Sequence, residues 1–118
     1  MNHVRRYCLA LDLKDDSDLI EAYKKHHAPG GVWPEILESI REAGIQLMEI
    51  YLTGNRLFMI IEPSEDFTFE AKAHMDQKNS TVQEWEALMD TFQQRLPWAK
   101  EDEKWVLMEK IFTTPMQE

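Results

Sequence analysis

Two apolar segments joined by a short glycine-containing turn constrain the fold of this chain more than any other feature. Residues 46–52 and 56–62 are predicted to be strands, and Thr53-Gly54-Asn55 between them is typical of a β-hairpin connection. Residues 57–61 are apolar throughout, and the first strand is apolar on both faces. Both sides of a sheet built on this hairpin must therefore be covered, and one layer of helices covers only one side.

The segment before the hairpin is predicted to contain one strand and two helices. Residues 6–13 alternate in the manner of a strand. The acidic run at residues 15–18 supplies N-cap candidates for a helix that ends near His27. Pro34 suits the first turn of a second helix, which is predicted to stop at Ala43-Gly44.

The segment after the hairpin is predicted to contain two helices and a fourth strand. The helices cover residues 67–75 and 82–96, with Pro97 ending the second, and the strand covers residues 105–112 before a frayed tail at 113–118. The order β-α-α-β-β-α-α-β predicts an α+β, ferredoxin-like fold with a four-stranded antiparallel sheet and helices on one side.

The sheet face away from these helices is expected to be apolar. It would carry Met48, Ile50 and Met59, or their neighbours of opposite parity. A second copy of the same sheet is a natural cover for such a face, so we predict a symmetric homodimer.

Composition and charge exclude several classes of protein. The 118 residues are expected to form one domain, residues 1–118. The formal net charge of −9, without clustered Lys and Arg, argues against nucleic acid and anionic membrane surfaces as partners. No segment reaches the run of about 18 apolar residues that a membrane span needs, and residues near the N-terminus lack a secretion signal's apolar core. With Cys8 as its one cysteine, the protein is expected in the cytoplasm.

Tyr23 and His27 are the leading candidates for chemistry. They lie four residues apart on one helical face, and His27 precedes the break at Pro29-Gly30-Gly31. A neutral imidazole both gives and takes a proton near pH 7. The same spacing also fits a structural pair, in which Tyr23 packs in the core and His27 caps the helix. His26 lies about 100° around the helix and is predicted to be solvated.

Other residues supply weaker candidates. Trp33 and Trp85 can stack on the apolar face of a sugar, and Tyr51 can add a hydroxyl donor, although core packing explains such aromatic residues as well. A metal site made of His26, His27 and His74 matches no metal-binding spacing, and the sequence contains no phosphate-binding loop or nucleophile elbow. We therefore expect neither a metal nor another cofactor.

Several of these residues belong to motifs of a known family. The motifs are Tyr23-x-x-x-His27-x-Pro29, Trp33-Pro34-Glu35, Ile50-Tyr51-Leu52, Leu57-Phe58, and Gln83-x-Trp85 followed by Met89. Through them the chain resembles, over essentially its full length, the L-rhamnose mutarotase family. These small enzymes interconvert the α and β anomers of a 6-deoxyhexose. The resemblance implies a dimeric α/β barrel of ferredoxin-like protomers, a monosaccharide substrate and no cofactor.

The resemblance also implies roles for five residues. His27 matches the family's catalytic histidine, and Tyr23 and Trp85 match residues that contact the substrate. Met48 stands where the rhamnose enzymes have a second pocket tyrosine, and Glu86 stands where they have a second tryptophan. Buried polar partners decide sugar specificity, and the resemblance extends to L-fucose mutarotases, so L-fucose is favoured over L-rhamnose. The alternative is a non-enzymatic ligand-binding barrel or a cofactor-independent oxygenase of the same fold.

Overall fold

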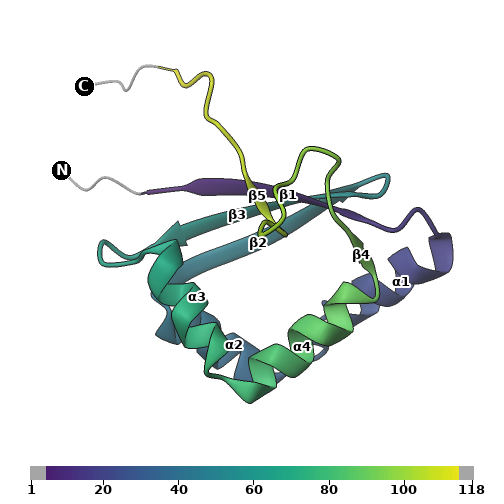
Figure 1. The fold of residues 1–118 in the computed structure, drawn as a ribbon, viewed down its shortest axis with the longest axis horizontal. Coiled ribbons are helices and arrows are strands. Elements are labelled where there is room, and N and C mark those ends of the chain that lie inside the picture. The colour runs from purple at the N-terminus through teal and green to yellow at the C-terminus, as the bar shows by residue number, and fades with distance from the viewer. Residues whose placement is uncertain (1–4, 115–118) are drawn as a thin grey trace.

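The protein folds as one antiparallel sheet with four helices packed on one side, as seen in a computed structural model that describes residues 5–114 (Figure 1). In chain order the elements are β1 (Tyr7–Leu13), α1 (Ser17–His26), α2 (Pro34–Glu42), β2 (Ile45–Thr53), β3 (Arg56–Pro63), α3 (Phe69–Gln77), α4 (Ser80–Asp90), β4 (Gln93–Gln94) and β5 (Val106–Leu107). None of the helices in residues 5–114 is long and apolar enough to cross a membrane.

The sheet has the strand order of a ferredoxin-like fold. Its order is β2-β3-β1-β4, and β5 also pairs with β1. β1 lies antiparallel to β3, with Leu9 opposite Met59 and Leu11 opposite Leu57. β2 and β3 form the predicted hairpin, whose turn places Gly54 at φ +58°, a left-handed conformation that favours glycine. The predicted α+β, ferredoxin-like architecture is confirmed.

The segment after α3 departs from the predicted elements. α4 ends at Asp90, not at residue 96, because the hydroxyl and amide of Thr91 both donate to the carbonyl of Leu88 and close the last turn. Gln93 and Gln94 then pair with Leu13 and Asp12 at the end of β1. The predicted helix over residues 82–96 is therefore too long.

Two short strands fill the fourth position of the sheet. β5 pairs with Leu9 and Ala10 further along the same edge of β1, so the predicted strand over residues 105–112 is reduced to two residues. Residues 95–105 connect the two pieces, and residues 108–114 lead away from the sheet (Figure 1). Residues 115–118 of the predicted tail lie outside the described part of the chain.

The helices of the described chain cover one face of the sheet and leave the other uncovered (Figure 1). Leu9, Leu11, Leu13, Leu57 and Ile61 point toward the helices and are buried. The pairing register turns Leu47, Tyr51, Phe58 and Ile60 to the opposite face, which no helix of the described chain covers (Figure 1). Leu47 is 39% exposed and Tyr51 is 54% exposed. Met48, Ile50 and Met59 face the helices, so the uncovered apolar residues are their neighbours of opposite parity.

Candidate active site

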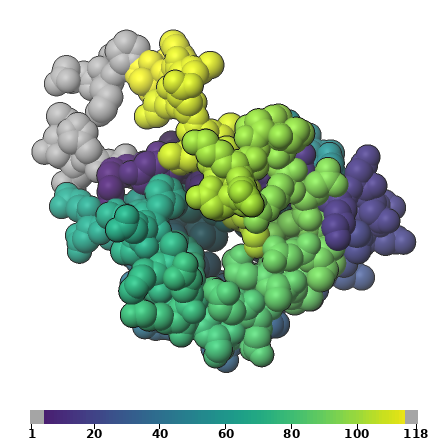
Figure 2. Space-filling view, viewed as in Figure 1, coloured from purple at the N-terminus to yellow at the C-terminus, as the bar shows by residue number. Residues whose placement is uncertain are grey.

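A cavity of about 1070 Å³ lies between the sheet and the helices. Its walls come from α1, α2, α3, α4 and the sheet, and Figure 2 shows a hollow between the helices and the sheet. The volume lies just above the range of roughly 300–1,000 Å³ found for ligand pockets. All five predicted site residues line it: Tyr23, His27, Met48, Trp85 and Glu86.

His27 follows the last residue of α1 and directs one ring nitrogen back into the helix. Its Nδ1 lies 2.8 Å from the carbonyl oxygen of Tyr23. A carbonyl oxygen only accepts, so Nδ1 carries the hydrogen and donates it. In the neutral ring, the lone pair therefore resides on Nε2. The capping and proton-transfer interpretations are thus compatible, because one nitrogen of His27 can serve each.

The environment sets the protonation of both side chains. Burial lowers the pKa of His27 below its ordinary 6.5; the bond to the Tyr23 carbonyl opposes this shift, and the neighbouring His26 adds to it. Burial raises the pKa of Tyr23 to about 12, which the hydrogen bond from Gln93 opposes and the charge of Glu86 reinforces. Near pH 7 the site thus holds a neutral imidazole beside a protonated phenol, with ring centroids 4.4 Å apart.

Trp85 forms part of the cavity wall from α4. Its side chain is 7% exposed and packs edge-on against Trp33 at 5.1 Å and against His27 at 5.7 Å between ring centroids. Trp33 does not line the cavity and supports Trp85 instead.

His26 is half-buried, with its ring 5.4 Å from that of Phe92, so the prediction of a solvated His26 is wrong. The turn after α4 brings Phe92 against the end of α1, which sequence spacing does not reveal.

Met48 and Glu86 line the cavity from opposite elements, β2 and α4. Oε1 of Glu86 accepts a hydrogen bond from Nζ of Lys104 at 2.8 Å.

Tyr51 lies on the uncovered face of the sheet, where its hydroxyl donates to Glu49, so its prediction as a cavity donor is wrong. The cause is the strand period: Met48 and Ile50 face the cavity, and Tyr51 must face away.

Gln93 and Trp105 are among the cavity residues that were not predicted. Nε2 of Gln93 donates to the hydroxyl of Tyr23 at 3.4 Å, and Trp105 completes the wall next to β5. Gln93 falls within the helix predicted over residues 82–96, and a two-residue polar strand has no sequence signal of its own. The partial alternation at residues 105–112 predicted a strand, but not that Trp105 faces a ligand space.

The histidines do not form a metal-binding group in the described chain. His74 is exposed on α3, while His26 and His27 lie at the end of α1. Among residues 5–114, no three His, Cys, Asp or Glu side chains gather in a way that could hold a metal ion.

The sequence matches a known family over most of its length. The model of the L-rhamnose mutarotase family matches residues 6–114. An L-fucose mutarotase from Xanthomonas campestris pv. campestris is 43% identical over 109 residues, which cover 92% of this chain and 87% of that protein. A UPF0734 protein from Dictyostelium discoideum is 36% identical over 115 residues, which cover 92% of this chain and 88% of the other.

Solved structures agree on the fold. An L-rhamnose mutarotase from Formosa agariphila superposes with a TM-score of 0.67 at 21% identity, covering 94% of this chain and 99% of that one. Tetracenomycin F2 cyclase from Streptomyces glaucescens superposes with a TM-score of 0.59 at 14% identity, with the same coverage. At such identities these likenesses concern the fold alone. On the family match and the 43% identical relative, the chain belongs to the L-rhamnose mutarotase family.

Proposed function

We propose that this protein opens and recloses the ring of a 6-deoxyhexose, L-fucose or L-rhamnose, by general acid and base catalysis at His27. Its family membership makes it a sugar mutarotase, an isomerase that interconverts α and β anomers. The observation that carries the catalytic part is the 2.8 Å contact between Nδ1 of His27 and the Tyr23 carbonyl, which leaves Nε2 available. The name of the 43% identical relative supports L-fucose as the first choice.

The reaction needs the anomeric hydroxyl to lose a proton and the ring oxygen to gain one, and both oxygens are bonded to C1. Nε2 of His27 accepts the proton of the anomeric hydroxyl, and the imidazolium returns it to the ring oxygen. The bond between C1 and the ring oxygen breaks as the C1 carbonyl forms, with no net change in protons. Rotation about the next carbon bond exposes the other face of the aldehyde, and the reverse steps close the ring. Tyr23, protonated at neutral pH, donates a hydrogen bond that orients the sugar.

Three further side chains are proposed to bind the sugar. Trp85 offers an aromatic wall for the apolar face of the deoxyhexose. Met48 fills space without a hydrogen-bond donor, and Glu86 adds a carboxylate that accepts from a hydroxyl. A site with this mixture discriminates between sugars through the hydroxyls that its polar groups pair.

The experiment that tests this function measures anomer exchange by saturation-difference NMR on L-fucose, L-rhamnose and D-galactose. We expect exchange well above the buffer rate, fastest for L-fucose. Heat-denatured protein serves as the control. Exchange at the buffer rate for all three sugars would contradict the proposal, and an oxidised product from an aromatic substrate would favour the oxygenase alternative instead.

The pH profile should follow the protonation of His27. Since burial lowers the pKa of His27, kcat/KM for exchange should rise with a midpoint below pH 6.5 and stay level at neutral pH. The same shift opposes folding in acid: the unfolded chain takes up this proton near pH 6.5 and the folded chain only at lower pH, so stability falls below pH 6.5. NMR exchange rates from pH 5 to 8 check the midpoint of the kcat/KM profile, and a midpoint above pH 6.5 would contradict the lowered pKa of His27.

We also propose that the protein is a homodimer, with the uncovered sheet faces of two copies packed together as a dimeric α/β barrel. The support is the group of apolar side chains on the face opposite the helices, Leu47, Tyr51, Phe58 and Ile60. An uncovered apolar sheet face in a water-soluble domain is typical of an isologous interface.

A charge placed on this face should separate the copies. Ile60→Glu is expected to give the 14.0 kDa mass of one chain in light scattering, whereas the wild type gives twice that mass. Met75→Glu, at a 41% exposed position on α3, is the matched control and should leave the mass unchanged. A dimer that survives Ile60→Glu, or a monomeric wild type, would contradict the interface.

Two broader expectations join the proposal: residues 1–118 act as one domain, and the protein works in the cytoplasm. The family match to residues 6–114 supports one domain. The single cysteine, Cys8, leaves no pair for an intrachain disulfide, which suits a reducing compartment.

A further inference from the structure

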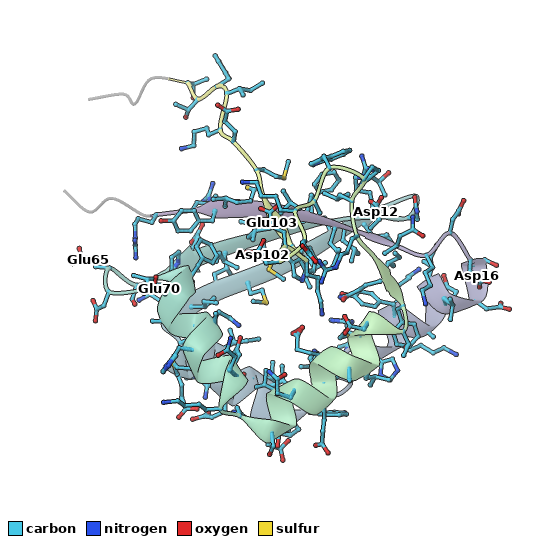
Figure 3. All side chains as sticks on the ribbon, viewed as in Figure 1. Asp12, Asp16, Glu65, Glu70, Asp102 and Glu103 are labelled. Carbon is cyan, nitrogen blue, oxygen red and sulfur yellow. The ribbon has the colours of Figure 1, made fainter. Side chains whose placement is uncertain are left out.

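Lys104 is a cation held against the wall of the cavity. Its Nζ lies 2.8 Å from Oε1 of Glu86 and 2.6 Å from Oδ1 of Asp90. Glu86 and Asp90 are one turn apart on α4, so both reach the same cation. Lys104 belongs to residues 95–105, the connection between β4 and β5, on which Figure 3 labels Asp102 and Glu103. A side chain from the sheet edge thus reaches across to α4.

The two carboxylates that Lys104 bonds face different spaces. Glu86 lines the large cavity with Tyr23 and His27. Asp90 lines a smaller space of about 260 Å³, together with Lys104 itself. The charge of Glu86 also raises the pKa of Tyr23, as expected when both groups face the same cavity. Of the pair, only Glu86 can therefore meet a ligand held beside Tyr23.

The geometry leaves one oxygen of Glu86 for a ligand. Lys104 donates to Oε1, and Oε2 has no hydrogen-bond partner among the described residues, so Oε2 is available to a group in the cavity. The Lys104 side chain is 22% exposed and that of Glu86 is 46% exposed, so the cation is the better buried partner. Burial works to lower the pKa of Lys104, but the bonds to Asp90 and Glu86 outweigh it, and Lys104 stays charged. A carboxylate fixed in this way loses less rotamer freedom when a ligand binds.

We propose that Lys104 is a positioning residue that holds Glu86 so that Oε2 accepts a hydrogen bond from a sugar hydroxyl. Lys104 thereby contributes to the choice among deoxyhexoses without touching the sugar. The inference rests on the proposed function, because it assigns the Lys104–Glu86 pair to the same cavity and substrate class. It adds a residue outside the cavity lining to the group that decides specificity.

The test is a double-mutant cycle on the full-length protein with L-fucose, using kcat and KM for anomer exchange. Lys104→Met and Glu86→Gln should each raise KM by about 10-fold, with smaller changes in kcat. The first variant frees the carboxylate, and the second replaces a charge-assisted hydrogen bond by a weaker neutral one. The double variant should be no worse than Glu86→Gln alone, because Lys104 acts through that carboxylate. Lys104→Arg, which keeps the cation, should restore most of the wild-type KM.

Lys100→Met is the matched control, since it removes the same charge from the same connection at an exposed position. It should leave KM unchanged. If Lys104→Met does not fold, Lys104→Gln takes its place in the cycle. Multiplicative effects of the two substitutions, or an unchanged KM in the Lys104 variant, would overturn the inference while leaving the proposed function intact. A wild type that exchanges no sugar above the buffer rate would overturn both.

Discussion

His27→Ala should reduce anomer exchange by about 10²–10⁴-fold, the typical contribution of a positioned general acid or base. The protein should remain folded, because the loss of a helix-terminal cap costs no more than about 1–2 kcal/mol. The exchange rate falls because the substitution removes the free Nε2 of a ring whose Nδ1 is fixed by the Tyr23 carbonyl. Saturation-difference NMR gives the rate, and circular dichroism with thermal melting checks the fold.

His26→Ala is the matched control for this substitution. His26 is the adjacent histidine, is also half-buried, and packs on Phe92 and Trp85 without lining the cavity. The His26→Ala variant should keep most of the exchange rate even if the substitution lowers stability. Tyr23→Phe should fall between the two, because it removes an orienting hydroxyl but keeps the ring. Unchanged exchange in His27→Ala would remove the mechanism.

Trp85→Ala should have the largest effect on stability. The side chain is 7% exposed and packs against Trp33 and His27, so its removal leaves a hole beside the cavity. A loss of about 3–5 kcal/mol is expected from truncating a buried aromatic residue of this size. Urea denaturation measures it. Exchange should fall as well, because both the stacking surface and the support of His27 are lost.

Trp98→Ala controls for the loss of a tryptophan as such. Trp98 is 62% exposed and makes a cation–π contact with Arg56, so its truncation should cost about 1 kcal/mol or less. Trp85→Phe should recover much of the stability and part of the exchange rate, since a flat ring remains at the wall. If Trp85→Ala were as stable as Trp98→Ala, the packing role given to Trp85 would be wrong.

The parts of the fold that follow from local pattern could be predicted from the sequence. The hairpin is fixed by strand period and by a glycine at Gly54, both of which act over a few residues. The helices α1, α2 and α3 begin within two residues of their predicted starts, helped by the caps at Asp16 and Thr68 and by Pro34. Ordering these elements was enough to predict the ferredoxin-like sheet.

The parts that depend on distant pairing could not be predicted. The pairing of Gln93–Gln94 and of Val106–Leu107 is decided by the free edge of β1, and pairs of residues this short carry no periodicity. Within the candidate site, the spacing of Tyr23 and His27 predicted their proximity. It could not give the tautomer of His27, which follows from a backbone carbonyl, or the contact of Gln93 with Tyr23.

A crystal structure of the protein with bound L-fucose tests the central claim most directly, because it locates the sugar relative to His27. The sugar should occupy the cavity lined by Tyr23, His27 and Trp85. Nε2 of His27 should lie within about 3 Å of the anomeric or the ring oxygen, as proton transfer requires. A sugar bound elsewhere, or bound in the cavity with both oxygens beyond hydrogen-bond reach of Nε2, would contradict the account.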